Sequence, residues 1–185
     1  MSGFAPLRTS RSRDQAVSYW LMPCPQAQLR FEALSQQAGR GLHGSTLPLH
    51  ITLYSDRLDH EDKIIDCLSQ VAMGRGPILL TPSAIEAGSL FTTSLIVRFA
   101  ASGELKSWFT QLRERSLKQL DYQLNPHLSL IYSSEPDSCR QAVAEELPLP
   151  APALFNRVRA VVHPLTISAA ADIRACISLQ EFTLT

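Results

Sequence analysis

Residues 47–55 of the chain read LPLHITLYS, and residues 124–133 read LNPHLSLIYS. Each stretch is an apolar segment that contains a proline, and each carries one histidine with a hydroxyl residue two positions later. The β-branched, aromatic and other apolar residues around each histidine are typical of β-strands. We therefore expect two matched strands that each display one histidine.

The two histidine motifs place polar side chains on one face of each expected strand. Successive side chains of a strand alternate between its faces, so residues i and i+2 point the same way. His50 and Thr52 therefore share a face of the first strand. His127 and Ser129 share a face of the second. A hydrophobic core does not need such polar pairs inside apolar strands, and we interpret the matched pairs as a functional site.

The size and composition are those of a soluble globular protein. The chain has 185 residues, of which 45% are apolar and 18% are charged, and this length suits one domain or two small lobes that share a core. Its 17 basic and 17 acidic residues cancel to a formal net charge of zero. Proteins that track long nucleic acids usually carry a basic excess, because phosphate contacts dominate their affinity. We therefore expect a small anionic ligand rather than a long duplex.

Further features of the sequence bear on the cellular setting. It has no apolar run near the roughly 20 residues that a membrane span requires, and no apolar signal peptide, so we expect a cytoplasmic location. The four cysteines are widely spaced without a C-x-x-C pair, which favours ordinary thiols over a structural zinc site. The Arg- and Ser-rich start predicts a flexible terminus over residues 1–15 rather than a transit peptide.

The rest of the chain alternates between helical and extended patterns. Apolar residues at helical spacing predict helices over residues 26–40, 59–73, 102–116 and 138–146. Short β-branched and aromatic runs predict strands over residues 17–22, 78–81, 89–99, 157–167 and 174–184. Turns are expected to connect neighbouring strands at residues 86–89 and 168–172. The first helix is expected to bury Leu29, Ala33, Leu34 and Ala38.

Each histidine strand is followed by a helix and then by paired extended segments. We interpret this shared order as an internal duplication that produces two α+β lobes, each contributing one histidine strand. The expected fold class is α+β: a bilobal, pseudo-two-fold, duplicated fold with two antiparallel sheets flanked by helices and a central cleft. Residues 16–185 are expected to form this single bilobal domain.

Two histidines that face one cleft can supply an acid and a base in a single reaction. Imidazole is the side chain whose ordinary pKa lies nearest neutrality. In the cleavage of a cyclic phosphodiester, one neutral histidine would accept a proton from the attacking water, and one imidazolium would donate a proton to the leaving sugar oxygen. The hydroxyls of Thr52 and Ser129 would donate hydrogen bonds to the non-bridging phosphate oxygens. This scheme requires no metal ion and no other cofactor.

These strands resemble the motifs of the 2H phosphoesterase superfamily, which is named for its two histidines. Within it, the opening YWLMP at residues 19–23 and the HLSLIY strand at residues 127–132 are most similar to the cyclic phosphodiesterases. The resemblance covers roughly residues 17–184. A single H-x-[ST] motif is common by chance, whereas two of them in matched strands are specific.

The resemblance implies hydrolysis of 2′,3′-cyclic nucleotides to 2′-phosphates and of ADP-ribose 1″,2″-cyclic phosphate to the 1″-phosphate. It also implies a bilobal fold without a metal ion. The motif positions carry over as two catalytic histidines and two phosphate-binding hydroxyl residues: His50, His127, Thr52 and Ser129.

Two aromatic residues are further candidates for contacts with the substrate. Tyr132 matches an aromatic residue that lines the phosphate end in the cyclic phosphodiesterases. Strict alternation would place Tyr132 on the wrong face from His127, so a strand end or a bulge is required. Phe91 is the candidate for an aromatic residue that flanks the base. Neither motif has a conspicuous Arg or Lys beside it, which leaves the contacts to the nucleoside open.

Other interpretations of the aromatic and histidine residues are structural. We expect Trp20 to belong to the core, although a strand that borders the cleft could expose its edge. His43 and His60 have no matching partner, and His163 is expected to be structural. Metal binding by the histidines is disfavoured, because no carboxylate or cysteine lies at ligand spacing from them.

The expected partner is a small cyclic nucleotide or cyclic phosphate, or else an RNA end, and no membrane is expected as a partner. The first alternative function is that of a 2′-5′ RNA ligase-like or RNA-end-processing 2H phosphoesterase. The second is a catalytically idle, nucleotide-binding module of the same fold. A monomer is the default oligomeric state, since no exposed apolar helix face stands out.

Overall fold

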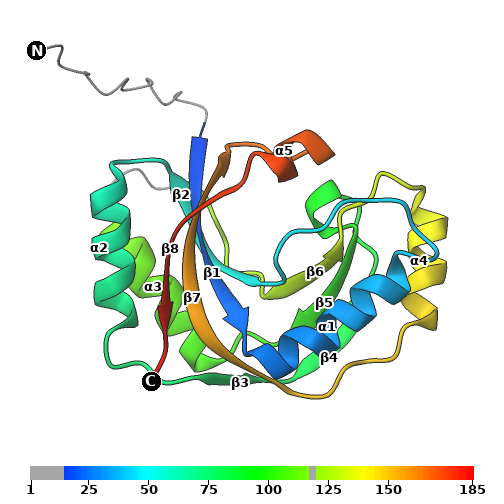
Figure 1. The fold of residues 1–185 in the computed structure, drawn as a ribbon, viewed down its shortest axis with the longest axis horizontal. Helices are drawn as coiled ribbons and strands as arrows, with labels where there is room; N and C mark the ends of the chain where they lie inside the picture. The colour runs from blue at the N-terminus through cyan, green and yellow to red at the C-terminus, as the bar shows by residue number, and fades with distance from the viewer. Residues whose placement is uncertain (1–14, 117–119) are drawn as a thin grey trace, which may run out of the picture.

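The computed structural model describes residues 15–116 and 120–185, and Figure 1 shows their arrangement. Helices and strands alternate along much of the chain, as the sequence predicts. In chain order the elements are β1 Gln15–Pro23, α1 Pro25–Ala38, β2 Ile51–Arg57, α2 Glu61–Ala72, β3 Ile78–Leu80, β4 Pro82–Glu86, the 3₁₀ turn η1 Phe91–Thr93, β5 Leu95–Phe99, α3 Gly103–Arg115, β6 His127–Ile131, α4 Asp137–Glu146, β7 Ala153–Pro164, α5 Ala170–Arg174 and β8 Ile177–Thr183.

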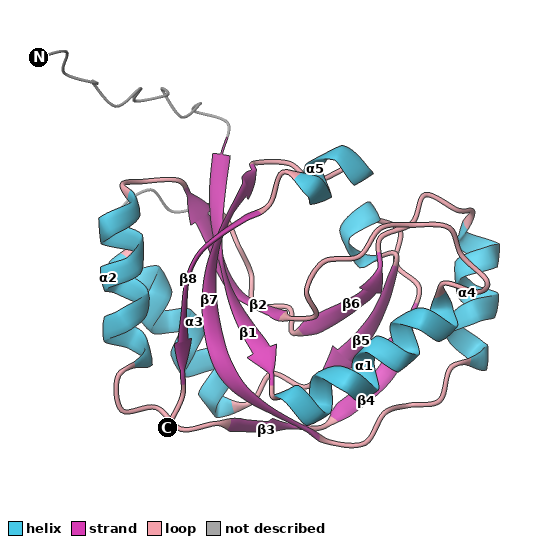
Figure 2. Cartoon of the chain, viewed as in Figure 1, coloured by secondary structure: helices cyan, strands magenta, loops and turns pink. Residues whose placement is uncertain are grey.

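The strands form one antiparallel sheet in the order β3-β7-β1-β2-β6-β5-β4, with β8 added beside β7. Its two parts meet at β2 and β6, where the register holds a single residue pair, Ile51 with Leu128. Figure 2 shows the strands arranged in an arc, with α5 above its concave side. The two antiparallel sheets expected from the sequence are therefore joined into one along this narrow seam.

Helices cover the convex side of each part of the sheet. Helices α2 and α3 pack on β2, β7 and β8, while α1 packs on β6 and α4 on β4 (Figure 1). The periodic apolar face predicted for the second helix accounts for this packing, because Ile64, Leu68 and Val71 are buried. The α+β class with an antiparallel sheet flanked by helices is thus confirmed.

The two parts of the sheet do not follow the order of the chain. The sequence predicts that each histidine strand and the segments after it form one lobe. Instead β5, which follows the first motif, pairs with β6, and β7, which follows the second motif, pairs with β1 beside β2. The chain therefore crosses between the two parts, because antiparallel pairing joins segments by complementary faces and not by their proximity in sequence.

The segment expected as one strand over residues 89–99 is divided in the structure. Residues Phe91–Thr93 form a 3₁₀ turn, and β5 begins only at Leu95. The N–H of Gly88 donates to the carbonyl of Thr93 at 2.9 Å, which closes the loop before β5. A Cβ on Gly88 would lie 2.4 Å from that carbonyl oxygen, so glycine is needed for this close approach. Strand β4, which pairs with β5, is an element that the sequence analysis missed.

Three smaller expectations also differ from the structure. Of the flexible terminus predicted over residues 1–15, residues 1–14 lie outside the described residues, and Gln15 is the first residue of β1. The turn expected at residues 168–172 contains the start of α5, where the Asp172 carboxylate accepts from the backbone N–H groups of Ser168 and Ala169. On α1, Leu34 and Ala38 are buried as expected, whereas Leu29 is 68% exposed and Ala33 is also exposed. Phe31 is buried instead.

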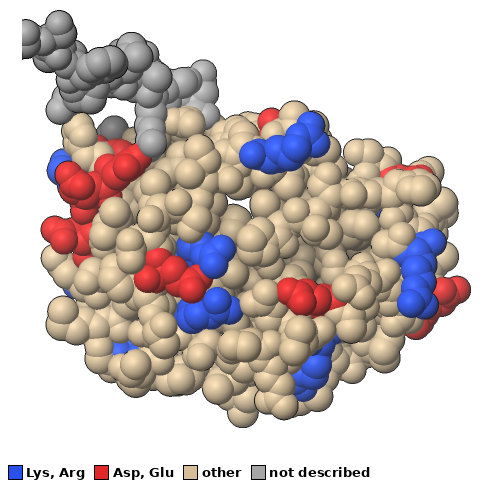
Figure 3. All heavy atoms as spheres, viewed as in Figure 1, with Lys and Arg blue, Asp and Glu red and all other residues tan. Residues whose placement is uncertain are grey.

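Charged side chains are dispersed over one face of the molecule. Figure 3 shows acidic and basic side chains scattered over the drawn face, and no continuous basic patch is seen among the described residues on that face. Within that part of the chain, no helix is long and apolar enough to cross a membrane. The four cysteines are free thiols, as expected.

Replacing Phe31 with alanine should lower the free energy of unfolding by about 3–5 kcal/mol, because its buried ring packs between the rings of Phe99 and Phe155. Urea denaturation measures the loss. Leu29→Ala removes an exposed side chain from the same helix, and it should change the stability by no more than about 0.5 kcal/mol. Equal losses in the two variants would contradict this orientation of α1.

Candidate active site

The two motif histidines are held in the same way at neighbouring strand starts. His50 lies directly before β2, and its Nδ1 is 2.6 Å from the carbonyl oxygen of Pro48. His127 is the first residue of β6, and its Nδ1 is 2.7 Å from the carbonyl oxygen of Asn125. A carbonyl oxygen can only accept, so each Nδ1 carries a hydrogen and donates it. Nε2 is then the ring nitrogen of each histidine that can accept or carry the exchangeable proton.

A bulge in each strand extends the matched faces beyond the H-x-[ST] motifs. The pairing of β1 with β2 shifts register between Tyr19 and Trp20, and the pairing of β5 with β6 shifts between Leu95 and Ile96. Each shift adds one residue to the histidine strand, which reverses the alternation after it. As a result, the fifth residue after each histidine returns to the face of that histidine: Ser55 after His50, and Tyr132 after His127.

For Tyr132 to share the face of His127, the sequence requires either a bulge or a strand end before it. The structure contains both. Strand β6 ends at Ile131, and Tyr132 forms an isolated bridge with Ser45. The ring of Tyr132 is buried, and burial raises the pKa of its hydroxyl to about 12, with the Ser129 hydroxyl beside it acting in the opposite direction. The Tyr132 hydroxyl is therefore protonated across the ordinary pH range.

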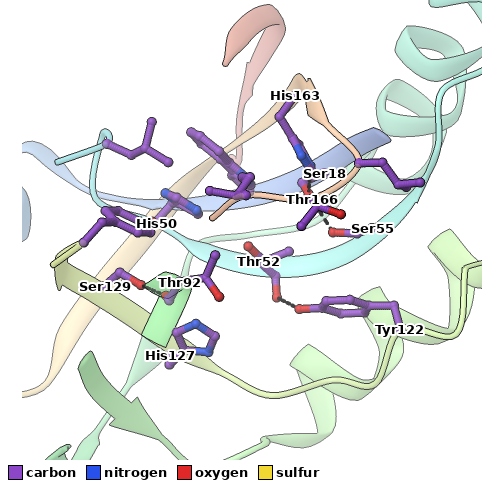
Figure 4. Close-up of a pocket in the computed structure, with 15 residues that line it drawn as sticks. Ser18, His50, Thr52, Ser55, Thr92, Tyr122, His127, Ser129, His163 and Thr166 are labelled. Atoms are coloured by element: carbon purple, nitrogen blue, oxygen red, sulfur yellow. Dashed lines mark hydrogen bonds between the residues drawn. The ribbon is translucent and has the colours of Figure 1, made fainter. Parts of the chain in front are cut away.

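The matched faces line one cavity of about 360 Å³. Five of the six sequence-predicted site residues lie around it, and in Figure 4 the two histidines approach from β2 and β6 with Thr52, Thr92 and Ser129 between them. The lining residues are Ser18, Trp20, Leu47, His50, Thr52, Ser55, Thr92, Tyr122, His127, Ser129, Tyr132, His163, Leu165, Thr166 and Ile167.

Phe91 is the predicted site residue that the structure does not place in this lining. It belongs to η1, and its ring centroid lies 6.0 Å from that of Tyr132. Phe91 instead lines a neighbouring surface pocket together with Tyr132, His43 and Ala169. Its position supports Tyr132 from outside the cavity.

The cavity is lined by neutral groups. Among the described residues around it, none is Lys, Arg, Asp or Glu. Burial lowers the pKa of His50 to about 3, and the hydrogen bond to Pro48 offsets only part of this effect. Burial also lowers the pKa of His127, again opposed by its backbone hydrogen bond. Both imidazoles are therefore neutral at pH 7 in the empty cavity, and an anion bound between them would favour protonation of one.

An arginine does lie beside the second motif, although the sequence shows none near it. Arg98 is the cross-strand partner of His127 on β5. Its guanidinium donates to the Glu86 carboxylate at 2.8 Å and also to the Asn125 side chain. Because Arg98 lowers the pKa of His127 while Glu86 raises it, this ion pair leaves the second histidine with little net bias.

Trp20 gives the first histidine an aromatic surface on which its ring stacks. Its ring stacks on His50 with a centroid distance of 3.5 Å and an interplanar angle of 8°. Trp20 is buried, as expected, but it also lines the cavity. The flat contact fixes the plane of the His50 ring, and the electron-rich indole face can stabilise an imidazolium.

Both hydroxyl residues of the motifs make a hydrogen bond to a neighbouring segment, Ser129 through its hydroxyl and Thr52 through its backbone carbonyl. The Ser129 hydroxyl donates to the carbonyl oxygen of Thr92 at 2.8 Å. To donate to a ligand, its proton must turn away from that carbonyl. The carbonyl of Thr52 accepts from the Tyr122 hydroxyl at 3.1 Å, which holds β2 against the segment that leads to β6. Figure 4 shows both bonds.

His163, for which the sequence predicts a structural role, also borders the cavity. It is buried, as a structural histidine would be, but it lines the cavity on β7. Its Nε2 lies 2.7 Å from the Ser18 hydroxyl of β1, and Ser18 lies 2.6 Å from the Ser55 hydroxyl. Isolated along the sequence, neither Ser18 nor His163 carries a pattern that distinguishes it. The signal is the strand pairing: Ser18 of β1 lies opposite Ser55 of β2, and His163 lies on β7, which pairs with the other side of β1.

Metal ligation was disfavoured by the sequence. Within the described residues, no group of three or more His, Cys, Asp or Glu side chains is arranged to hold a metal ion. The absence of a metal and of a cofactor remains a prediction.

Searches with the sequence found no match among protein-family models or curated proteins. Searches with the structure found LigT of E. coli, at 12% identity and a TM-score of 0.57, covering 92% of this chain and 98% of that one. TT0787 of Thermus thermophilus matches at 14% identity and 0.62, covering 91% and 97%. Usb1 of Kluyveromyces marxianus matches at 14% identity and 0.54, covering 91% and 98%.

These three structures are 2H phosphoesterases, and they match nearly the full length of this chain. At such low identity the likeness concerns the arrangement of the backbone. The chain therefore has the LigT-like fold of the 2H phosphoesterases, which confirms the fold that the resemblance of the two motifs predicted.

Folding should become less favourable as the pH falls from 7 to 4. The unfolded chain protonates its histidines near pH 6.5, whereas burial keeps His50 neutral to about pH 3 in the folded chain. The unfolded state then binds more protons, so stability is lost below pH 6.5. Urea denaturation at pH 7 and pH 5 should show that His50→Asn removes on the order of 2 kcal/mol of this pH dependence. An unchanged pH dependence in the variant would contradict a buried neutral His50.

Proposed function

We propose that the protein hydrolyses small cyclic phosphodiesters by two-histidine acid and base catalysis, without a metal ion. The proposed substrates are 2′,3′-cyclic nucleotides, converted to 2′-phosphates, and ADP-ribose 1″,2″-cyclic phosphate, converted to the 1″-phosphate. The observation that carries the proposal is the equivalent restraint of His50 and His127, each with Nδ1 bonded to a carbonyl oxygen two residues earlier. Both histidines line one cavity with two hydroxyl residues that can bind phosphate.

In the proposed reaction, water attacks phosphorus and transfers a proton to Nε2 of the base histidine. The bond between phosphorus and the leaving sugar oxygen breaks, and that oxygen takes a proton from Nε2 of the acid histidine. For a 2′,3′-cyclic nucleotide the bond that breaks is the one to the 3′-oxygen. Thr52 and Ser129 would donate to the non-bridging oxygens, where negative charge increases in the transition state.

We assign the base to His50 and the acid to His127. His50 is the more buried of the two, and burial keeps it in the neutral form that a base requires. His127 is only half-buried, and the ion pair of Arg98 with Glu86 beside it leaves its charge state with little net bias. A phosphodiester anion in the cavity would raise the pKa of both histidines, and His127 would then be the first to hold a proton.

The neutral lining favours a small substrate over an RNA chain. A monoanionic phosphodiester needs one imidazolium and oriented hydroxyls, whereas a polynucleotide needs cations for its further phosphates. The described lining residues include no Lys or Arg. LigT structures include complexes with 3′-AMP, phosphate, NADP+ and ATP, which supports a nucleotide or phosphate ligand for this shared fold.

Turnover of 2′,3′-cyclic AMP in excess EDTA, measured from pH 4 to 9, should follow a bell-shaped profile in kcat/KM. Its maximum should lie below pH 6.5, because the pKa values of both free histidines are lowered by burial. His50→Ala and His127→Ala should each lower kcat by about 10³-fold or more.

Circular dichroism of the two variants controls for folding. Thr166→Ala, at an exposed position on the cavity rim, is a matched change outside the proposed acid, base and phosphate ligands. A folded wild type that hydrolyses neither proposed substrate contradicts the proposal. If that protein still binds the nucleotide, the result would favour the catalytically idle binding module.

A phosphodiester with a p-nitrophenyl leaving group should distinguish the acid from the base. Nitrophenolate leaves without a proton, so His127→Ala should recover to within about tenfold of the wild-type rate. His50→Ala should remain slow, because the attacking water still needs a base. Steady-state kinetics on 2′,3′-cyclic AMP and on the p-nitrophenyl diester measures the rate of each variant relative to the wild type. Recovery of His50→Ala in place of His127→Ala would reverse the assignment of acid and base.

A further inference from the structure

The cavity contains a second polar arrangement that the proposed acid and base chemistry does not use. The Ser55 hydroxyl of β2 lies 2.6 Å from the Ser18 hydroxyl of β1, and Ser18 lies 2.7 Å from Nε2 of His163 on β7. Nδ1 of His163 lies 2.7 Å from the carbonyl oxygen of Pro164. All three side chains line the cavity, and Figure 4 shows them together on the side of Thr52 away from His127.

The directions of these hydrogen bonds follow from counting protons. The carbonyl of Pro164 can only accept, so Nδ1 of His163 carries the hydrogen of the neutral ring and Nε2 has a lone pair. Ser18 must therefore donate to His163. Its single proton is then used, and the short contact with Ser55 requires that Ser55 donate to Ser18. With both protons committed, the oxygen of Ser55 presents only lone pairs to the cavity.

The neutral state of His163 is consistent with its surroundings. It is buried at 8% exposure, and burial lowers its pKa. The groups that face it are uncharged: Ser18 on β1, the Pro164 carbonyl on its own strand, and His50, which is itself neutral. Among the described lining residues no carboxylate is present that would favour an imidazolium.

We propose that Ser55, oriented by Ser18 and His163, accepts a hydrogen bond from a hydroxyl group of the substrate, so that this corner selects a free sugar hydroxyl over a second phosphate. The proposal rests on the proposed function. Of the two proposed substrates it favours the 2′,3′-cyclic nucleotides, whose 5′-hydroxyl is free, over ADP-ribose 1″,2″-cyclic phosphate, whose 5″-oxygen carries a diphosphate. Phosphate oxygens only accept hydrogen bonds, and they would meet the lone pairs of Ser55 without a cation nearby.

The location of Ser55 fits the part of the ligand next to the phosphate. Ser55 follows Thr52 by three residues on β2, which is about 10 Å or less along a strand with a bulge. A ribose attached to a phosphate at Thr52 extends over such a distance. In a nucleoside 2′,3′-cyclic phosphate or its 2′-phosphate product, the 5′-hydroxyl is the sugar hydroxyl farthest from the phosphate. We therefore assign the 5′-hydroxyl to Ser55.

Binding of three ligands, measured by calorimetry at pH 7.5, tests this assignment without requiring turnover. The ligands are adenosine 2′-phosphate, its 5′-deoxy analogue and adenosine 2′,5′-bisphosphate. In the wild type, the 5′-deoxy analogue should bind about tenfold more weakly than the parent, the effect of one hydrogen bond. Adenosine 2′,5′-bisphosphate should bind at least about tenfold more weakly than adenosine 2′-phosphate.

Ser18→Ala frees the Ser55 proton to turn toward the ligand. The penalty for the bisphosphate should then fall to about threefold or less, while the 5′-deoxy penalty persists, because Ser55 can still accept. His163→Phe should produce the same change, since Ser18 would then donate to Ser55. Ser83→Ala, an exposed serine of β4, is the matched control and should leave all ratios unchanged.

An unchanged bisphosphate penalty in folded Ser18→Ala overturns the proposal, as does a wild type that binds the bisphosphate as tightly as the parent or binds none of the three ligands. If the wild type hydrolyses cyclic phosphodiesters but binds the three adenosine ligands with equal affinity, the proposed function stands and this role of Ser55 is refuted. If the affinity ratios are as expected but the wild type hydrolyses no cyclic phosphodiester, the role of Ser55 is supported and the proposed reaction is refuted.

Discussion

The site depends on one hydrogen bond that occurs twice, from Nδ1 of a histidine to the carbonyl oxygen two residues earlier. In each case the acceptor lies in a proline-containing segment that leads into the strand, at Pro48 for His50 and at Asn125 for His127. The bond selects the tautomer and restricts the ring, so Nε2 of each histidine is available for proton transfer. Burial then sets the protonation state, and the strand pairing sets which hydroxyls share the face.

The local part of this arrangement could be predicted from the sequence. Two-residue periodicity placed Thr52 with His50 and Ser129 with His127, and it also required an irregularity before Tyr132. The contributions of Trp20 and of His163 depend on pairing between strands that are far apart in the chain. Nothing in the residues beside them indicates that pairing. The sequence therefore predicted a structural role for His163, and a core position for Trp20 with an exposed edge only if its strand bordered the cleft.

The arrangement of the strands shows the same limit on a larger scale. Helical spacing and β-branched runs identified most elements, because these patterns are local. They also suggested lobes that follow the chain, whereas β5 pairs with β6 and β7 lies in the part that contains β2. Strand β4 was missed because PSAIE at Pro82–Glu86 has little β-propensity of its own, and pairing with β5 makes it extended.

The neutral lining has a consequence for the end of a catalytic cycle. In the proposed reaction a monoanionic diester becomes a phosphomonoester that carries close to two negative charges near neutral pH. The cavity offers that product no additional cation among its described lining residues, and the ion pair of Arg98 with Glu86 is already satisfied. The same surface that accepts the substrate therefore retains the product weakly, and its departure should not limit the rate.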